Sequence, residues 1–353
     1  MPRKSPTPPK DLRSPEVHPD GVVTFRLWAP KAKTVLLAED ILPSLNPPEP
    51  VPLTKGDNGV WTVTLGPLAP DIYDYAFHVD GVRTPDPANW FAKSGAIPPV
   101  SRVNVPGHEP RFFDLQAVPH GIIQRLTYYA TTLSAERELY LYLPPNYDPA
   151  HAYPILYLLH GRGELANAWL DMGYANRIAD NLIAAGRLQP AIIVMPLGFS
   201  IPTLDDLYAP NVWHAAERFA DELLTDILPF VERRFPITER AIAGLSMGGY
   251  QSQGIALSQP QRFVAAGLFS GAFGNLAETL PNRAPVADIN ANLRLLWIAN
   301  GDRDDLVGPS VNAALADFAT LGIAHQFHSY AGGHSWPIWR PMLRDFLTAL
   351  WPA

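Results

Sequence analysis

Residues 240–258 read RAIAGLSMGGYQSQGIALS, and this stretch predicts the architecture of the larger part of the chain. RAIAGL has the length and apolar character of a buried strand, and MGGYQSQGIALS is long enough to form a helix. Ser246 stands between the two, in a Gly-x-Ser-x-Gly pattern with Gly244 and Gly248. We therefore expect a sharp strand-to-helix turn that projects the serine hydroxyl over the edge of a sheet.

The glycines on either side of Ser246 suit such a turn, because side chains at Gly244 and Gly248 would clash with neighbouring backbone. The following helix points its N-terminus at the serine, which favours negative charge that develops there. The backbone N–H of Met247 is therefore our first candidate donor for an oxyanion hole.

A serine hydroxyl is a weak nucleophile at neutral pH and needs a base. The strand-like run AHQFHSY is followed by AGGHSW, in which His334 comes after two glycines. That backbone freedom would let its imidazole reach the serine, so we expect His334 to be the base. His325 and His328 lie within the expected strand, and we expect them to be structural.

The expected acid follows the strand-like run RLLWIAN, where the sequence reads GDRDD. The chain order serine, acid, histidine, each after a strand, matches a known catalytic arrangement. Three aspartates share this loop, and the residues alone do not separate Asp302 from Asp304. A second oxyanion donor is expected in His160-Gly161-Arg162-Gly163, which follows the run YPILYLL. We expect the Arg162 N–H to donate and Gly161 to allow close approach.

The chain divides by pattern into four parts. We expect residues 1–19 to be a disordered, Pro-rich tail, and residues 20–105, with period-2 alternation between turn residues, to form an antiparallel β-sandwich. A linker is expected at 106–120. In 121–353, strand-like and helix-like runs alternate, which predicts a mostly parallel sheet with helices on both faces. The clearest helix is expected at about 215–234, with one apolar face made by Phe219, Leu223, Leu224, Ile227, Leu228 and Val231.

Composition limits the partners and the chemistry. The formal net charge is −7 and basic residues do not cluster, so we expect neither nucleic acid nor membrane as a partner. The absence of cysteine excludes disulfides, thiolate metal sites and a cysteine nucleophile. The N-terminus has basic residues but no apolar core behind them, so we do not expect it to be a secretory signal as it stands. We expect a cytoplasmic protein, or a secreted one whose signal has been removed; the oligomeric state is not indicated.

On these motifs, residues 121–353 resemble the feruloyl and acetylxylan esterases of carbohydrate esterase family 1 and the related enterochelin esterases. The matching blocks are RELYLYLPPNYD, YPILYLLHGRGE, DNLIAAGRLQPAIIVMPLG, RAIAGLSMGGYQS, NGDRDDLVG and AGGHSWPIWR. The resemblance implies an α/β-hydrolase fold. Its Gly-x-x-Asp pattern selects Asp304 as the acid, and its Gly-Gly pair selects His334 as the base.

The N-terminal part resembles the immunoglobulin-like module of isoamylases and glycogen-branching enzymes, carbohydrate-binding family 48. The matching stretches are VTFRLWAPKAKTVLLA, GVWTVTLGPLAPDIYDYAFHVDGV and TPDPAN. Starch-binding members carry exposed tryptophans in two loops that here read EDILPSLNPPEP and VRTPDP, without tryptophan. We expect Trp28, Trp61, Tyr73 and Tyr75 to be core residues. Trp90 and Phe91 are expected to pack on the esterase domain or to line the rim of its cleft.

These observations predict a serine carboxyl-ester hydrolase that needs no metal or organic cofactor. The resemblance makes feruloyl or acetyl esters of plant xylan, free or attached to polysaccharide, the leading substrates. Tryptophans in segments that flank the site are candidates for stacking on a phenolic acyl group, or for core packing: Trp169, Trp213, Trp336 and Trp339.

Three alternatives remain open. An enterochelin-type esterase would need a basic pocket, and only Arg162, Arg303 and Arg340 stand near the motifs. A serine peptidase would share the fold and the triad, but usually carries a larger second domain. A non-catalytic carbohydrate-binding protein with a relic hydrolase domain is disfavoured by the complete serine, aspartate and histidine positions.

Overall fold

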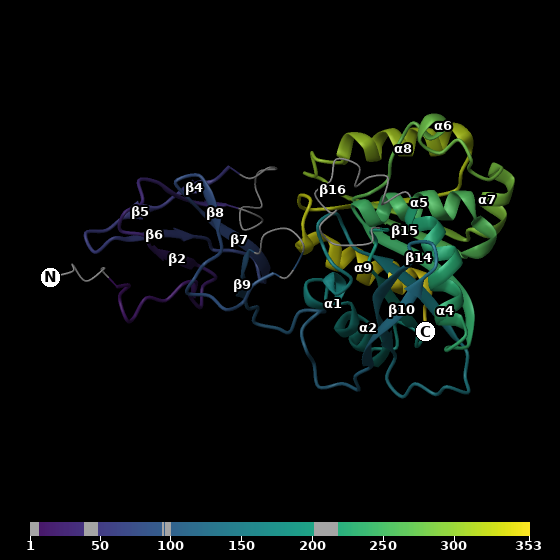
Figure 1. Cartoon of the computed structure of the whole chain (residues 1–353), viewed down its shortest axis with the longest axis horizontal. Helices are drawn as coiled ribbons and strands as arrows, with labels where there is room; N and C mark the ends of the chain where they lie inside the picture. Colours follow the sequence, from purple (N-terminus) through teal and green to yellow (C-terminus); the bar gives the residue numbers. More distant parts are fainter. Residues whose placement is uncertain (1–6, 39–48, 94, 96–99, 201–217) are drawn as a thin grey trace. The chain divides into compact units, whose positions relative to one another are not determined.

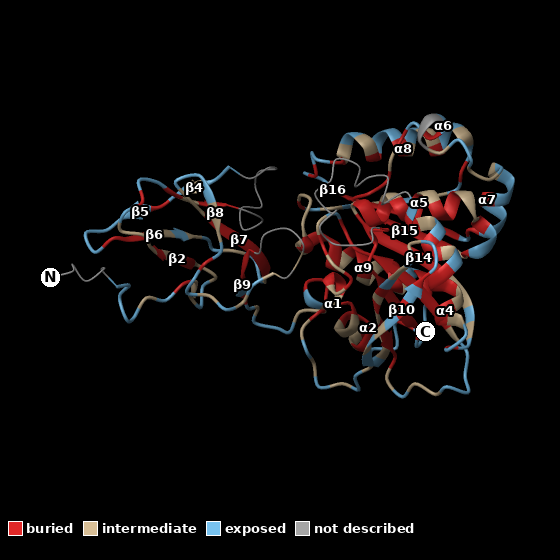
Figure 2. Ribbon diagram, viewed as in Figure 1, coloured by how far each residue is buried: buried red, intermediate tan, exposed pale blue. Residues whose placement is uncertain are grey.

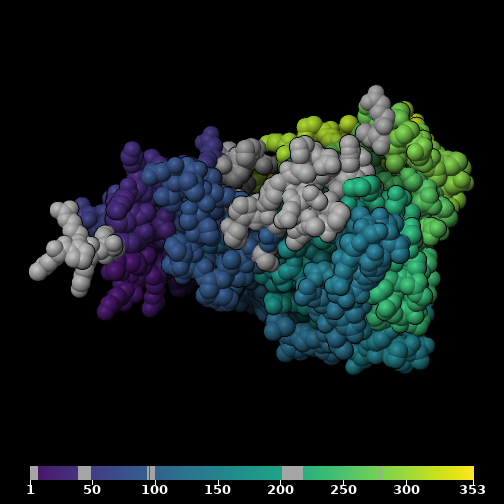
Figure 3. Space-filling view, viewed as in Figure 1, coloured from purple at the N-terminus to yellow at the C-terminus, as the bar shows by residue number. Residues whose placement is uncertain are grey.

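The computed structural model describes residues 7–38, 49–93, 95, 100–200 and 218–353. Among the described residues, the chain falls into two compact units that divide between Pro110 and Arg111, apart from Gly95, which groups with the second. In the space-filling view, purple to blue marks the first unit and teal to yellow the second (Figure 3).

The first unit consists of two antiparallel sheets that enclose one core. One sheet has the order β1(Glu16–Val17), β2(Val23–Trp28), β6(Val60–Leu65), β5(Thr54–Lys55). The other has the order β4(Val51–Pro52), β3(Val35–Ala38), β7(Asp71–Val79), β8(Val82–Thr84), and β9(Ser101–Val105) also pairs with β7. This is the immunoglobulin-like sandwich that the alternation predicts.

The aromatic residues of this unit divide between core and surface. Trp61, Tyr73 and Tyr75 are buried in the core as expected, whereas Trp28 is only half-buried. Trp90 is 92% exposed. Phe91 is half-buried, with the Arg102 guanidinium 4.7 Å from its ring centre.

The sandwich begins earlier than expected, whereas its last strand, β9, ends at Val105. Strand β1 lies inside the expected tail, and the buried Ser14 hydroxyl accepts a hydrogen bond from the Arg26 N–H, so ordered structure begins before residue 20. The second half of the expected linker packs on the second unit. There the ring of Phe113 stacks on Tyr174, because an apolar ring is buried more favourably than left in solvent.

The second unit contains an eight-stranded sheet of order β10(Ile122–Ala130), β11(Ala135–Leu143), β13(Ile192–Pro196), β12(Tyr153–Leu159), β14(Ile237–Leu245), β15(Ala265–Phe269), β16(Leu295–Gly301), β17(Gln326–Tyr330). Strands β10, β11 and β13 pair antiparallel, and the pairs from β13 to β17 are parallel. Strands β13, β15 and β16 are buried along their whole length, as in sheets covered on both faces (Figure 2).

Helices cover both faces of this sheet (Figure 1). Leu268 and Ile298 face one side, in a core shared with the helices that precede and follow Ser246. Phe269 and Trp297 face the other side and contact Phe346 of the last helix. The remaining elements are α1(Ala168–Asp171), α2(Ala175–Ala184), η2(Leu223–Ile227), α4(Leu228–Glu232), α5(Met247–Ser258), η3(Pro260–Arg262), α6(Leu276–Thr279), α7(Val286–Asn292), α8(Gly308–Leu321) and α9(Trp336–Leu350).

The helix expected at about 215–234 is helical over residues 218–232, and residues 215–217 lie outside the described part of the chain. Its expected face is buried except for Leu224, which is partly buried. One difference was not expected: the turn η2 is a π-helix rather than an α-helix. No helix within the described ranges has the length and hydropathy needed to cross a membrane.

Candidate active site

Ser246 lies at the turn between β14 and α5, as the glycine pattern predicts. Its backbone adopts φ 52° and ψ −117°, a conformation that non-glycine residues rarely occupy and that tight surroundings must hold in place. A Cβ on Gly244 would lie 2.5 Å from the Gly248 carbonyl carbon, and one on Gly248 would lie 2.6 Å from the Leu159 oxygen. The two glycines therefore allow the approach of backbones that creates the turn.

His334 brings its ring to this serine from the loop after β17. Its Nε2 lies 2.9 Å from Ser246 Oγ, and its Nδ1 lies 2.9 Å from Asp304 Oδ2. An ionised carboxylate can only accept a hydrogen bond, so Nδ1–H donates to Asp304 and Nε2 accepts from the serine hydroxyl. The side chain of Asp304 is fully buried, whereas His334 keeps 13% of its side chain exposed.

The neighbouring Asp302 has another role. Its Oδ1 accepts the Gly332 N–H at 2.8 Å, which ties the loop of His334 to the loop of the aspartates. Its side chain is half-exposed and lies 3.5 Å from the Arg303 guanidinium. Only Asp304, of the two aspartates that the residues alone did not separate, contacts the imidazole.

The loop expected to carry the second oxyanion donor lies against Ser246. A Cβ on Gly161 would lie 2.5 Å from Leu245 Cδ1 and 3.6 Å from the Cβ of Ser246, so a side chain here would have to displace Leu245. The Gly161 N–H itself donates to Glu164 Oε2 at 3.0 Å. The next N–H along the chain, that of Arg162, and the N–H of Met247 at the start of α5 remain the candidate donors.

Glu164 was not identified from the sequence. It is buried, and its second oxygen accepts the indole N–H of Trp336 at 3.1 Å. One carboxylate thus links the Gly161 loop to the first residue of α9, two positions after His334. A glutamate in a glycine-containing loop is more often a solvated charge, so no sequence signal pointed to it.

His160 is also part of this framework. Its Nδ1 lies 2.8 Å from the Gly161 carbonyl oxygen, and its Nε2 accepts the Gly198 N–H at 2.9 Å. Complete burial lowers the pKa of His160 from its ordinary value, because the charged ring would lose its hydration. A neutral ring with the proton on Nδ1 satisfies both contacts.

The tryptophans that were candidates for the substrate pocket differ in their burial and in the groups that they contact. Trp169 and Trp336 are fully buried, contact each other edge to face, and use their indole N–H groups on Leu159 and Glu164, so they are core residues. Trp339 lies edge to face on the His334 ring, with centroids 5.0 Å apart. Trp213 lies outside the described residues.

The two histidines expected to be structural are away from the serine. His328 stacks on Trp297 with ring centroids 3.5 Å apart, and burial lowers its pKa. His325 lies one residue before β17, and its Nδ1 contacts the Ile323 oxygen. Among the residues that the structure describes, no group of three or more His, Asp or Glu side chains is arranged to hold a metal ion.

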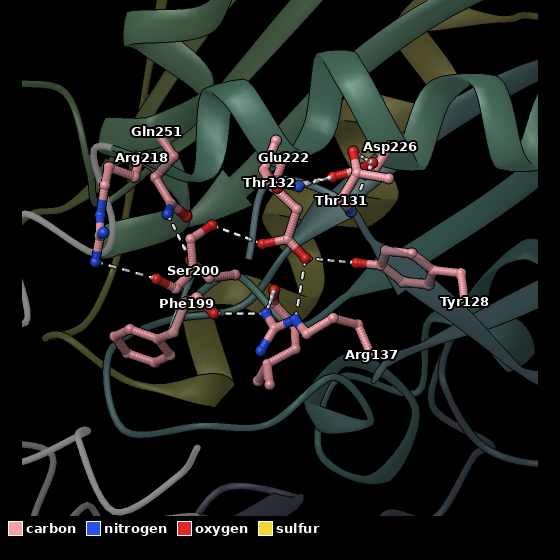
Figure 4. A network of polar contacts seen from close by, with 12 residues as sticks. Tyr128, Thr131, Thr132, Arg137, Phe199, Ser200, Arg218, Glu222, Asp226 and Gln251 are labelled. Carbon is pink, nitrogen blue, oxygen red and sulfur yellow. Dashed lines mark hydrogen bonds and ion pairs between the residues drawn. The ribbon is translucent and has the colours of Figure 1, made fainter. Parts of the chain in front are cut away.

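A buried polar network joins β10, β11 and the segment after β13 to Glu222 (Figure 4). Arg137 of β11 and Glu222 form an ion pair with 3.0 Å between Nε and Oε1, and both side chains are almost fully buried. Glu222 also accepts from the Tyr128 and Ser200 hydroxyls. Burial and the adjacent Glu222 carboxylate raise the pKa of Tyr128 above its ordinary range, so this phenol stays a hydrogen-bond donor.

The mostly parallel sheet, with a serine at the strand-to-helix turn of β14 and α5, defines the class of an α/β-hydrolase. A family model described as "Putative esterase" matches residues 130–350, which is more than half of the chain, and the chain belongs to this esterase family. A second model, described as "Carbohydrate-binding module 48 (Isoamylase N-terminal domain)", matches residues 14–92.

Two curated relatives are similar to this chain. The "Endo-1,4-beta-xylanase/feruloyl esterase" of Xylanibacter ruminicola is 30% identical over 351 residues, which cover 95% of this chain and 46% of that protein. The "Endo-1,4-beta-xylanase Y" of Acetivibrio thermocellus is 32% identical over 145 residues, 36% of this chain and 12% of that protein. The chain therefore spans less than half the length of both.

Solved structures share the fold. A CE1 ferulic acid esterase from Anaeromyces mucronatus has a TM-score of 0.57 at 23% identity, over 67% of this chain and 92% of its own. An enterochelin esterase from Shigella flexneri has a TM-score of 0.69 at 18% identity, over 95% of this chain and 94% of its own. At these identities the likeness extends to the fold alone.

Proposed function

We propose that this chain hydrolyses carboxylic esters by two-step acyl transfer, with Ser246 as nucleophile, His334 as base and Asp304 as the acid that orients it. The observation that carries the proposal is the pair of 2.9 Å hydrogen bonds that connects the Ser246 hydroxyl to the His334 imidazole and the imidazole to the Asp304 carboxylate. Three residues from different loops have no structural need to meet in this order, but acyl transfer requires it.

In the first step, His334 Nε2 takes the hydroxyl proton as Ser246 Oγ attacks the ester carbonyl carbon. The carbonyl oxygen becomes an oxyanion, held by the N–H groups of Met247 and Arg162. Asp304 stabilises the imidazolium that forms, which then gives its proton to the departing alcohol. Water hydrolyses the acyl-enzyme by the same sequence of proton transfers and regenerates Ser246.

For the natural substrate, we propose feruloyl or acetyl esters of plant xylan. The xylanase/feruloyl esterase relative, which is similar across both units of this chain, supports this substrate class. Two of the three arginines near the motifs are already engaged: Arg340 is buried and donates to the Met172 oxygen, and Arg303 lies beside Asp302. A site with little basic charge suits a neutral ester.

A catecholate siderophore ester is the second candidate. The likeness in fold to enterochelin esterases extends over both units, which favours it. Such a ligand is acidic, however, and the engaged arginines argue for lower affinity.

A panel of p-nitrophenyl acetate, methyl ferulate, acetylated xylan, an iron–catecholate trilactone and a matched anilide tests the proposal. We expect the wild type to favour the feruloyl or acetyl esters over the trilactone. Ser246→Ala should lower kcat about 10⁴-fold or more on every substrate that is turned over. Unchanged p-nitrophenyl acetate hydrolysis by Ser246→Ala would reject catalysis at this serine, and equal rates on the anilide would point to a peptidase.

A further inference from the structure

The segment Leu197–Ser200, which follows β13, has no helical or strand structure but is fully buried. Side chains from several elements bind its carbonyl groups. Arg137 donates to the Leu197 and Phe199 oxygens, and Arg218 donates to the Ser200 oxygen at 3.4 Å. The buried Arg137–Glu222 ion pair thus holds a short irregular segment in a fixed shape (Figure 4).

Gly198, within this segment, connects the two elements that carry the candidate oxyanion donors. Its N–H donates to His160 Nε2 at 2.9 Å, and its carbonyl oxygen accepts the Gln251 amide N–H at 2.7 Å. His160 Nδ1 in turn donates a hydrogen bond to the Gly161 carbonyl oxygen. This carbonyl and the Arg162 N–H belong to the same peptide group. In a planar trans peptide this carbonyl fixes the direction of that N–H.

Gln251 makes the second connection. It is buried on α5, one helical turn after Met247, so its amide fixes the start of that helix relative to Gly198. The space around Gly198 is narrow: a Cβ there would lie 3.2 Å from Gln251 Oε1 and 3.6 Å from both His160 Nε2 and Met247 Cε. Gly198 therefore lies between His160, which precedes the Gly161–Arg162 peptide, and α5, which begins with Met247. Because residue 198 has no side chain, its backbone can contact both.

We propose that Gly198 and Gln251 are positioning residues that set the distance between the two oxyanion donors. The bond from Gln251 fixes the Met247 side of the oxyanion hole, and the bond to His160 fixes the Arg162 side. This inference rests on the proposed acyl-transfer function. It adds that the Leu197–Ser200 segment, which supplies no reacting group, determines how well the developing oxyanion is held.

The chain offers a matched control. Gln253 lies on the same helix, is equally buried, and uses its amide on the N–H and carbonyl of Phe273 instead of on Gly198. Gln251→Met and Gln253→Met each keep the side-chain length and remove the amide. Both should lower the melting temperature. Only Gln251→Met should lower kcat, by about tenfold to a hundredfold, with KM within about twofold, because misplaced donors weaken transition-state binding.

A tetrahedral analogue gives a readout that global stability does not move. Phenylboronic acid binds the active serine as a tetrahedral adduct, and its inhibition constant should rise with Gln251→Met as kcat falls and stay constant with Gln253→Met. The backbone angles at residue 198 allow alanine. Gly198→Ala should therefore lower kcat and raise the inhibition constant as Gln251→Met does, and it replaces Gln251→Met in the test if that variant folds poorly. Equal kcat losses in both glutamine variants, or unchanged boronate binding with Gly198→Ala, would overturn the proposal. Activity retained by Ser246→Ala would instead refute the proposed function.

Discussion

Replacing Asp304 by asparagine tests the electrostatic part of the mechanism most directly. The carboxylate is buried, and its Oδ2 lies 2.9 Å from the imidazole Nδ1. At an effective dielectric constant of about 20, a charge pair at this distance is worth about 6 kcal/mol. Since about 1.4 kcal/mol equals a factor of ten in rate, full loss of this stabilisation lowers kcat about 10⁴-fold.

Asparagine retains a hydrogen bond but not the charge, and its amide can also donate to Nδ1, which favours the tautomer that cannot accept the serine proton. We therefore expect Asp304→Asn to lower kcat on p-nitrophenyl acetate about 10³- to 10⁴-fold, with an unchanged far-ultraviolet circular dichroism spectrum. Asp302→Asn is the control. Its half-exposed side chain can still accept the Gly332 N–H, so kcat should stay within about threefold of wild type. A larger loss from Asp302→Asn than from Asp304→Asn would refute this assignment of the acid.

Four further substitutions have outcomes that follow from the packing around the serine. Glu164→Gln replaces one of the two carboxylate oxygens by an NH₂ group, which then faces an N–H donor. The free energy of unfolding measured in urea should therefore fall by about 1–3 kcal/mol. An unchanged denaturation midpoint would contradict the two hydrogen bonds. Gly248→Ala places a methyl group 2.6 Å from the Leu159 oxygen and should destabilise by at least about 1–3 kcal/mol. Gly254→Ala, on the same helix but facing open space, should stabilise by up to about 1 kcal/mol, and calorimetry should order the melting temperatures accordingly. The pKa of His160 is lower in the folded chain than in the unfolded chain. Below about pH 6.5 the unfolded chain therefore binds a proton at His160 that the folded chain does not bind. The free energy of unfolding should fall as the pH drops from 6.5 towards the folded-state pKa. His160→Gln should reduce this loss in thermal melts between pH 8 and 5, and an identical pH dependence would exclude His160 as its source.

Much of the catalytic unit could be predicted from local pattern. The Gly-x-Ser-x-Gly motif specified a turn that only glycines at 244 and 248 allow, and the apolar runs specified strands covered on both faces. The alternation of the N-terminal part specified its sandwich. These features depend on residues close in sequence, so periodicity and turn chemistry were sufficient.

Other features depended on contacts between distant residues. Glu164 and Gln251 act on partners that a local pattern does not reveal. Asp302 and Asp304 both reach the loop of His334, but Asp302 binds the Gly332 N–H and Asp304 binds the imidazole. Trp336 looked equally suited to a pocket or a core, because its neighbours are set by the packing of α9. Burial and partner choice at such positions are properties of the assembled unit, and residue type alone leaves them open.

The π-turn at Leu223–Ile227 has a consequence for how this helix can change in length. Glu222, just before it, reaches Arg137, and Asp226, within it, binds the hydroxyls and N–H groups of Thr131 and Thr132 at the β10–β11 hairpin. Deleting one residue from this turn would restore regular winding but rotate one carboxylate by about 100° relative to the other. One end of the hairpin would then lose its acceptor. A one-residue gap should therefore be tolerated far less well here than in a surface loop.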